Sequence, residues 1–288
     1  MISESERKIG LLGATSVGVG AIVGGGILAL AGAAFATTGP SAMVAFALNG
    51  VIAMLTALSF AEMASKFPES GGIYTFSKKV LSVEAAFTVG WVVWFASIVA
   101  AALYAIGFAY FGLVVAGEIW QGFQGEAPSW LESTLTLKGV AVATIALLTI
   151  ALTQQSESSG KWVNLGKVVV FGTLILGGLW AVGNQSLQVT SEALRPFFSA
   201  GTLGLFQAMG YTFIAMQGFD LIAAVGGEVR DPSKNVPRAM VLSLAIALVI
   251  YIPLLFIIAT VGTQSGESIG ELAAKDPEGI IAVAAQQY

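Results

Sequence analysis

Long stretches without a charged residue constrain this chain more than any other feature. No Lys, Arg, Asp or Glu interrupts five runs, which cover residues 11–61, 85–117, 139–156, 168–191 and 239–266. A helix needs about 20 apolar residues to cross the hydrocarbon core of a bilayer, so these runs predict membrane spans. They lack the apolar–polar alternation of barrel strands. The expected fold class is therefore an all-α integral membrane protein.

Composition supports this class and excludes several kinds of chemistry. Of the 288 residues, 56% are hydrophobic and 10% are charged, against about 25% charged in an ordinary soluble domain. The chain has no cysteine and no histidine, so it lacks a thiol nucleophile, a thiolate metal site and an imidazole base. We therefore expect no enzyme activity, no metal and no cofactor. A net charge of −4 without a strongly basic surface argues against nucleic-acid binding.

Seven spans are predicted within the apolar runs. A turn at 37–40 divides the first run, because Gly39 relaxes the backbone and Pro40 fixes φ. The predicted spans are 11–36, 41–62, 85–117, 139–156, 162–184, 199–226 and 239–262. The more polar segment 263–288 is expected to be an external loop with room for a short helix.

The distribution of basic residues predicts a cytoplasmic N-terminus in a plasma membrane. In that orientation ten of the 13 Lys and Arg residues lie inside and three lie outside, as the positive-inside rule requires. The inner set is Arg7, Lys8, Lys66, Lys78, Lys79, Lys161, Lys167, Arg230, Lys234 and Arg238, and the outer set is Lys138, Arg195 and Lys275.

A glycine run interrupts the first span. Gly24, Gly25 and Gly26 together cost about 3 kcal/mol of helix propensity relative to alanine. Such a run lets the helix open, and the N-terminus of the half-helix that follows attracts an anion such as a carboxylate. The alternative is close helix packing through Gly20 and Gly24, which have GxxxG spacing.

An acid marks the sixth span. Asp220 lies in an apolar run, where a carboxylate costs about 2.5–3.5 kcal/mol and usually serves a function. Gln217 and Gly218 beside it predict a second helix break. The alternative is that Asp220 lies near enough to the cytoplasmic interface to be solvated. Glu62 and Glu228, close to predicted helix ends, are also expected at that interface.

Several motifs resemble the amino acid–polyamine–organocation (APC) superfamily. Gly24–Ile27 is similar to the glycine-rich motif of its first helix. Phe60–Met63 and Pro68–Tyr74 resemble the exit of its second helix and the loop that follows. Gly218–Asp220 and Glu228–Ala239 resemble its sixth helix and the next loop. The motifs occur in the right order over nearly the whole chain.

The resemblance implies a five-helix inverted-repeat transporter fold in which helices 1 and 6 are discontinuous. Residues 1–184 would form the first repeat and residues 199–288 the start of the second, within one transmembrane domain that is a piece of a longer protein. The implied function is secondary active transport of an L-amino acid by alternating access, either coupled to protons or by exchange.

The resemblance also implies where substrate binds. Its carboxylate would meet the backbone around Gly25, where the family frequently has a serine. Its ammonium would meet carbonyls of the opened sixth helix. Phe219 would line or gate the pocket, and Asp220 would read a cationic side chain or a proton. The full predicted substrate-binding set is Val23, Gly24, Gly25, Gly26, Ile27, Phe213, Ile214, Met216, Gly218, Phe219 and Asp220.

Lys167, about a turn and a half into the fifth span, is the predicted proton-coupling residue. Some proton-coupled relatives place a fifth-helix lysine where sodium-coupled members of the fold bind a cation. A buried lysine gains and loses a proton readily, so it could substitute for that ion. The alternative is that its apolar stem lets the ammonium reach the cytoplasmic face.

A seven-helix receptor or sensor that binds a small ligand without transport is the alternative function. A retinal protein would need a Schiff-base lysine in the last span, and 239–262 has none. A receptor has no need of glycine breaks in two helices, and a channel would need a ring of acids or a selectivity loop. The expected partners are therefore an amino acid, protons and the lipid bilayer.

Overall fold

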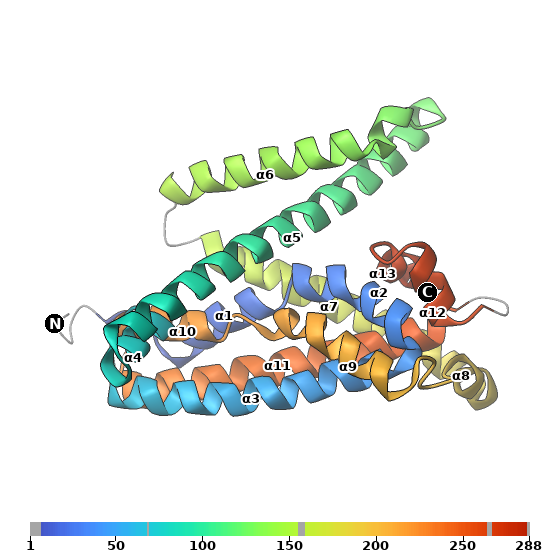
Figure 1. Cartoon of the computed structure of the whole chain (residues 1–288). Coiled ribbons are helices and arrows are strands. Elements are labelled where there is room, and N and C mark those ends of the chain that lie inside the picture. Colours follow the sequence, from blue (N-terminus) through green and yellow to red (C-terminus); the bar gives the residue numbers. More distant parts are fainter. Residues whose placement is uncertain (1–6, 68, 155–158, 264–266, 287–288) are drawn as a thin grey trace. The chain divides into compact units, whose positions relative to one another are not determined.

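The computed structural model describes residues 7–67, 69–154, 159–263 and 267–286. Within these ranges every regular element is a helix. Contacts divide the chain into two compact units. Unit 1 consists of Met1–Val92 and Lys161–Tyr288, and unit 2 consists of Val93–Gly160. Figure 1 traces the chain through both.

Unit 1 contains most of the helices, including three short 3-10 segments labelled η. Its elements are α1 (Leu11–Ile22), α2 (Gly25–Thr38), η2 (Gly39–Ser41), α3 (Ala42–Lys66), α4 (Gly72–Val80), the start of α5 (Val83–Gln124), α7 (Ser159–Asn184), α8 (Leu187–Ala193), α9 (Gly201–Thr212), η4 (Phe213–Met216), α10 (Asp220–Ala224), η5 (Gly226–Glu228), α11 (Pro232–Val261), α12 (Ile269–Lys275) and α13 (Ile280–Ala285).

The core of unit 1 lies where α11 packs along α3 and α1 (Figure 1). Small residues let α3 and α11 approach closely. A Cβ atom on Gly50 would lie only 2.3 Å from a methyl carbon of Leu248, and Ala53 and Ala57 on the same helix are fully buried. Close backbone approach through small residues is the usual basis of helix packing in a membrane.

Among the residues that the structure describes, five helices are long and apolar enough to cross a membrane, which supports a multi-pass membrane protein. They are Gly25–Lys66, Val83–Phe123, Thr134–Ala151, Gly166–Asn184 and Pro232–Val261. The count is below the predicted seven because the first and sixth predicted spans are interrupted, and because the first of these five joins α2 to α3.

Some boundaries differ from those predicted. At 42 residues, α5 would be about 63 Å long, twice the hydrocarbon thickness of about 30 Å, so it extends beyond the predicted span. The predicted fourth span corresponds to α6 (Thr134–Gln154), and its last two residues, 155–156, lie outside the described residues. The short helices α4 and α8 were not predicted, whereas α12 and α13 lie in the segment expected to have room for one.

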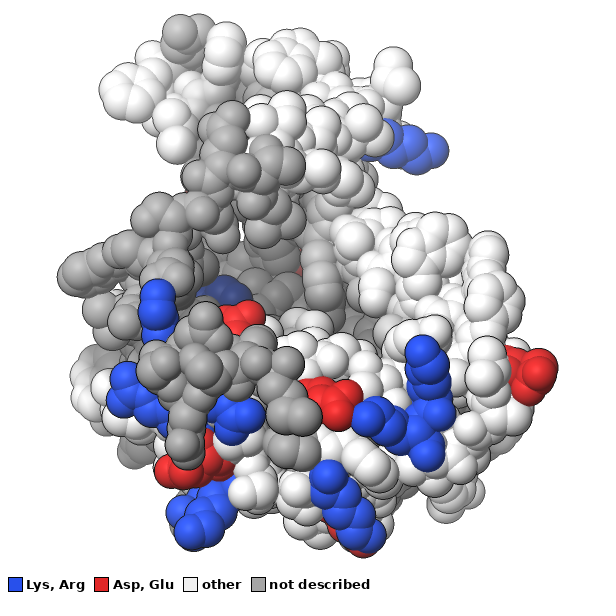
Figure 2. All heavy atoms as spheres, turned by 90° about the vertical axis from the view of Figure 1, so that its left-hand side faces the viewer, with Lys and Arg blue, Asp and Glu red and all other residues white. Residues whose placement is uncertain are grey.

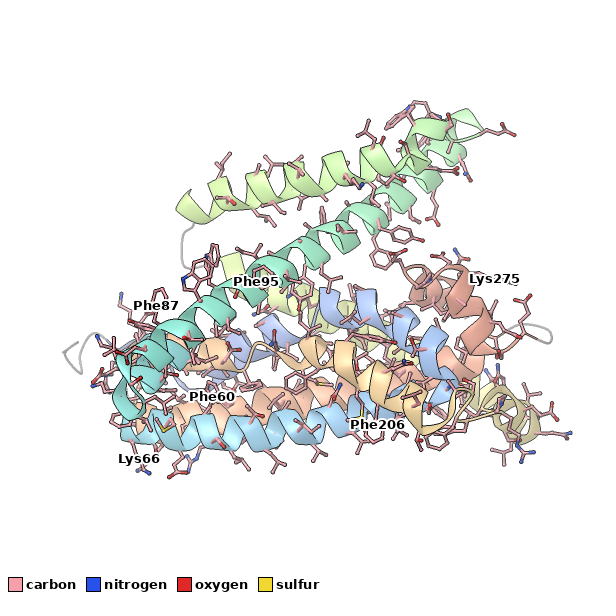
Figure 3. The ribbon with its side chains drawn as sticks, in the orientation of Figure 1. Phe60, Lys66, Phe87, Phe95, Phe206 and Lys275 are labelled. Carbon is pink, nitrogen blue, oxygen red and sulfur yellow. The ribbon has the colours of Figure 1, made fainter. Side chains whose placement is uncertain are left out.

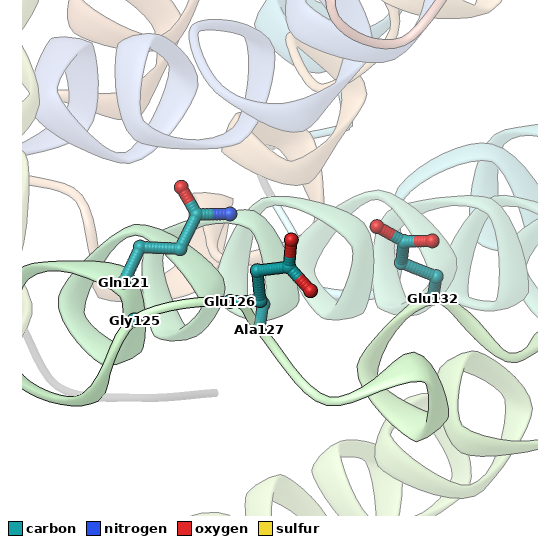
Figure 4. Close-up of a pocket in the computed structure, with 5 residues that line it drawn as sticks. All are labelled: Gln121, Gly125, Glu126, Ala127 and Glu132. Atoms are coloured by element: carbon teal, nitrogen blue, oxygen red, sulfur yellow. The ribbon is translucent and has the colours of Figure 1, made fainter.

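Unit 2 is a helical hairpin of α5 and α6 joined through η3 (Ser129–Glu132). Ala105, Ala109 and Ala141 form its small buried core. Beside the turn, a hollow of about 450 Å³ is lined by Gln121, Gly125, Glu126, Ala127 and Glu132 (Figure 4). The hollow is broad and open, and it contains none of the predicted site residues.

One end of unit 1 is rich in basic side chains. This basic end consists of the last turn of α3, helix α4 and the segment 226–238. Figure 2 shows Lys and Arg gathered on the face that it presents, and Figure 3 places Lys66 here and Lys275 at the opposite end of the unit. At the basic end the N-terminal segment joins the segment after α10, because the amide of Ile9 donates to the Glu228 carbonyl at 3.1 Å.

Candidate functional site

The helical path of the first predicted span is interrupted at two residues. α1 ends at Ile22 and α2 begins at Gly25, so the first break consists of Val23 and Gly24, both with extended backbone. Gly25 and Gly26 belong to the first turn of α2 rather than to the opened segment. The first amide groups of a helix have no partner within it, so those of α2 are directed at the break.

The second break separates η4 from α10. Gln217 is extended, and Gly218 has a φ of +129°, a backbone conformation that favours glycine. The backbone amide of Gly218 donates to Oδ1 of Asp220 at 3.1 Å. The Asp220 carboxylate therefore binds the second break directly, and α10 begins at that residue.

The second break lies against the end of α1, directly before the first break. A Cβ atom on Gly218 would lie 2.7 Å from the Cβ of Ala21 and 2.9 Å from both the Ala21 carbonyl carbon and the Ile22 amide nitrogen. A side chain of any size would force these segments apart. The absence of a side chain at Gly218 is therefore what allows the second break to lie against the end of α1.

A tyrosine from α11 contacts the two segments that lead into the breaks, the end of α1 and η4. The hydroxyl of Tyr251 donates toward the Ile22 carbonyl at 2.6 Å and toward the Ala215 carbonyl at 3.2 Å. Its side chain is fully buried, and its ring meets Phe46 edge to face with the centroids 6.0 Å apart. The unbroken helix α11 therefore supplies a polar group where the two broken helices meet.

Lys167 reaches the first break from α7. Its ammonium donates to the Gly20 carbonyl at 2.7 Å, and a Cβ atom on Gly24 would lie 3.6 Å from Nζ. One turn earlier, the Asn164 amide donates at 3.1 Å to both the carbonyl and the hydroxyl of Ser16. These contacts fix α7 against α1, with the lysine directed at the break.

Two further polar contacts hold the half-helices that end at the breaks. The buried amide of Asn49, on α3, donates at 2.9 Å to the Met209 carbonyl and to the Thr212 hydroxyl at the end of α9. The Tyr211 hydroxyl donates to the Ala33 carbonyl of α2 at 2.7 Å and also contacts the Thr37 hydroxyl.

The remaining predicted site residues fall into two groups. Val23, Ile27 and Met216 are buried, and Phe213 and Ile214 are partly exposed in η4. The ring of Phe219 packs edge to face on Phe60, with centroids 5.8 Å apart, and Phe60 is labelled in Figure 3. Its role as a gate remains a prediction.

Sequence reasoning did not single out Tyr251, Asn49 or Asn164. The available signal was a polar side chain within an apolar span, which is uncommon and often functional. Lys167 and Asp220 were predicted because they are charged, whereas Tyr251, Asn49 and Asn164 are neutral.

A sequence profile described as amino acid permease matches residues 9–286. The chain belongs to the amino acid permease family. The predicted resemblance is thereby confirmed, and the family is one of membrane transporters rather than enzymes.

The chain is similar to several proteins of Bacillus subtilis (strain 168). The branched-chain amino acid permease BcaP is 29% identical over 253 residues, which are 86% of this chain and 53% of that protein. The serine/threonine exchanger SteT is 30% identical over 253 residues, with the same two shares. The methylthioribose transporter is 26% identical over 270 residues, which are 92% of this chain and 57% of that protein. The chain spans about half the length of the curated relatives that it matches.

Proposed function

We propose that this permease carries an L-amino acid across the membrane by alternating access. The observation that supports this function most strongly is the close approach of the second break to the end of α1, next to the first break, since paired broken helices create a polar site at the middle of a membrane. In the proposed fold, the spans α1–α2, α3, α5, α6 and α7 form one five-helix repeat. The spans α9–α10 and α11 open a second repeat of inverted topology.

The two breaks offer complementary charges to an amino acid. The unpaired amides at the start of α2, from Gly25 to Ile27, would bind the carboxylate, because a helix N-terminus carries partial positive charge. Carbonyl groups of η4 around Phe213, Ile214 and Met216 would bind the ammonium. A carboxylate accepts several hydrogen bonds, so Asp220 can hold the Gly218 amide and still face a cation.

Binding and uptake of radiolabelled amino acids in proteoliposomes test this function. We expect uptake that depends on a substrate or proton gradient. Gly25→Leu would place a bulky side chain at the first turn of α2 and abolish binding while the protein still inserts. The matched control is Gly112→Leu in α5, where a Cβ atom would meet nothing within 4 Å. Undiminished affinity in Gly25→Leu would refute the site.

Coupling to protons is proposed to run through Lys167. The hydrogen bond from its ammonium to the Gly20 carbonyl supports this role, because loss of the lysine proton would weaken that bond at the end of α1. Transport should then need no sodium, and Lys167→Ala should remove its dependence on pH. The control is Lys138→Ala at the start of α6. Strong sodium dependence, or Lys167→Met with normal pH-dependent uptake, would refute the coupling role.

A further inference from the structure

We infer that Tyr251 is a positioning residue whose hydroxyl bridges the two helix breaks and sets the spacing of the backbone groups that face the substrate. The bridge itself stands on the contacts described above. Its effect on substrate rests on the proposed function.

The two carbonyls that Tyr251 joins are both exposed by the breaks. Ile22 is the last residue of α1, so its carbonyl lies where the helical ladder stops. Ala215 lies in η4, just before the second break. Each carbonyl carries partial negative charge and needs a donor in a low-dielectric interior. Two such groups that face one another repel. A hydroxyl between them reduces this repulsion, because its proton is attracted to both oxygens.

A phenolic hydroxyl has one proton, so it cannot bond both carbonyls equally. The distances assign the stronger bond to Ile22, at 2.6 Å, and the weaker one to Ala215, at 3.2 Å. The side chain therefore holds the end of α1 more tightly than η4, and it contacts both.

The position of the hydroxyl is fixed by an element that does not itself break. α11 is continuous from Pro232 to Val261 and packs against both α1 and α3. The Tyr251 ring is fully buried, and its edge-to-face contact with Phe46 of α3 holds its orientation. α11 thus holds the hydroxyl in one place relative to the Ile22 and Ala215 carbonyls.

This arrangement has a consequence for specificity. The bridge occupies the Ile22 and Ala215 carbonyls and leaves other η4 carbonyls for an ammonium group. It also fixes how far those carbonyls lie from the α2 amides. A fixed spacing favours ligands with carboxylate and ammonium on one carbon, as in α-amino acids, over β-amino acids. Tyr251 would therefore set substrate class without touching the substrate.

Hydrogen–deuterium exchange in lipid nanodiscs tests the bridge without any ligand. The informative amides are Val23, which donates to the Val19 carbonyl at 2.8 Å, and Gln217, which donates to the Ile214 carbonyl at 3.1 Å. Tyr251→Phe keeps the ring and removes the hydroxyl, so both amides should exchange about fivefold faster or more.

The matched control is Tyr104→Phe on α5, which removes a phenol from a helix that carries neither break. It should leave both rates within about twofold of the parent. Unchanged rates in Tyr251→Phe, or an equal rise in the control, would overturn the inference.

Replacing Tyr251 by para-aminophenylalanine gives a second test that does not depend on the folding of Tyr251→Phe. The aromatic amine has two N–H donors, one for each carbonyl. Exchange at Val23 and Gln217 should then match or fall below the parent rates, and faster exchange would contradict the bridge.

Binding of L-alanine and β-alanine, with L-leucine and L-serine as further probes, tests the effect on substrate. Tyr251→Phe should reduce the preference for α- over β-amino acids by about tenfold, or 1.4 kcal/mol, and para-aminophenylalanine should restore it. An unchanged preference, with faster exchange, would overturn the specificity role and leave the bridge. If the parent binds no amino acid, the proposed function fails, and the exchange rates still decide the bridge.

Discussion

Gly218 is the position where a side chain would separate the second break from the end of α1. Its φ of +129° disfavours any side chain, and a Cβ atom would contact Ala21 and Ile22 at less than 3 Å. We expect Gly218→Ala to destabilise the protein by about 2 kcal/mol or more, from backbone strain and overpacking together. Amino-acid binding should weaken in parallel, because the breaks would separate.

Gly210→Ala on α9 is the control for Gly218→Ala. Nothing lies within 4 Å of a Cβ atom there, so it should raise stability by about 0.5–1 kcal/mol through helix propensity. Thermal unfolding and ligand binding report both outcomes. A Gly218→Ala protein as stable as the parent would show that the contact between the breaks is not tight.

Asn49 tests the contact that holds the end of α9. Asn49→Leu would leave the Met209 carbonyl and the Thr212 hydroxyl without this donor, at a cost of about 1–3 kcal/mol in unfolding free energy. Thr56→Val on the same helix is the control, since the exposed Thr56 hydroxyl binds only its own helix at Ile52. Equal losses in the two variants, measured by thermal unfolding, would contradict a special role for Asn49.

At the level of single residues, sequence located the unusual glycines and charges but not their partners. A glycine run and an intramembrane acid stand out in an apolar span, whereas a tyrosine in α11 looks like ordinary core. The importance of Tyr251 depends on carbonyls that only the breaks expose, and on the approach of three helices. Such a contact between distant segments has no local signal.

Among the elements, α12 has a stability that should depend on pH. Ser268 and Glu271 form a capping box at its N-terminus. The hydrogen bond from the Ser268 backbone, then that from its side chain, lower the pKa of the Glu271 carboxyl below its ordinary value, with a smaller contribution from Lys275. A pKa that is depressed in the folded state means that the cap stabilises α12 above the ordinary glutamate pKa. The stabilisation is lost as pH falls through the lower, folded value.

Hydrogen exchange at the Ser268 amide measures this effect, because that amide donates to Glu271 at 3.0 Å. Comparison with Glu271→Gln at the same pH cancels the intrinsic pH dependence of exchange. The parent should be better protected at pH 7, and the two proteins should converge as pH falls through the lowered, folded pKa of Glu271. Equal protection at pH 7 would show that the carboxylate charge adds nothing to the cap, since glutamine can accept the same hydrogen bond.

Element positions were largely predictable, and their ends were not. Hydropathy located the long helices, but only the structure distinguishes Gly24, which leaves the helix, from Gly25 and Gly26, which start α2. That distinction depends on what packs against each residue. α4 escaped prediction because a nine-residue amphipathic helix has no long apolar run.

For the whole molecule, the charge-free runs were enough to predict an all-helical membrane protein. The family followed from motifs that are widely separated in sequence. The bounds of α5 were less predictable, because hydropathy marks the part of a helix that suits lipid and does not mark where the helix itself ends. Orientation in the membrane depends on charges outside the apolar runs and has to be measured.

The orientation prediction can be tested by labelling single cysteines, since the chain has none of its own. The excess of basic residues at one end predicts that this end faces the cytoplasm. In intact cells an impermeant maleimide should therefore label Lys275→Cys and Ser129→Cys but not Lys78→Cys, and all three positions are exposed. Permeabilising the cells is the control, after which Lys78→Cys should also be labelled. Labelling of Lys78→Cys in intact cells, with the other two protected, would reverse the orientation. The proposed carboxylate-binding amides of α2 would then be approached from the opposite side of the membrane.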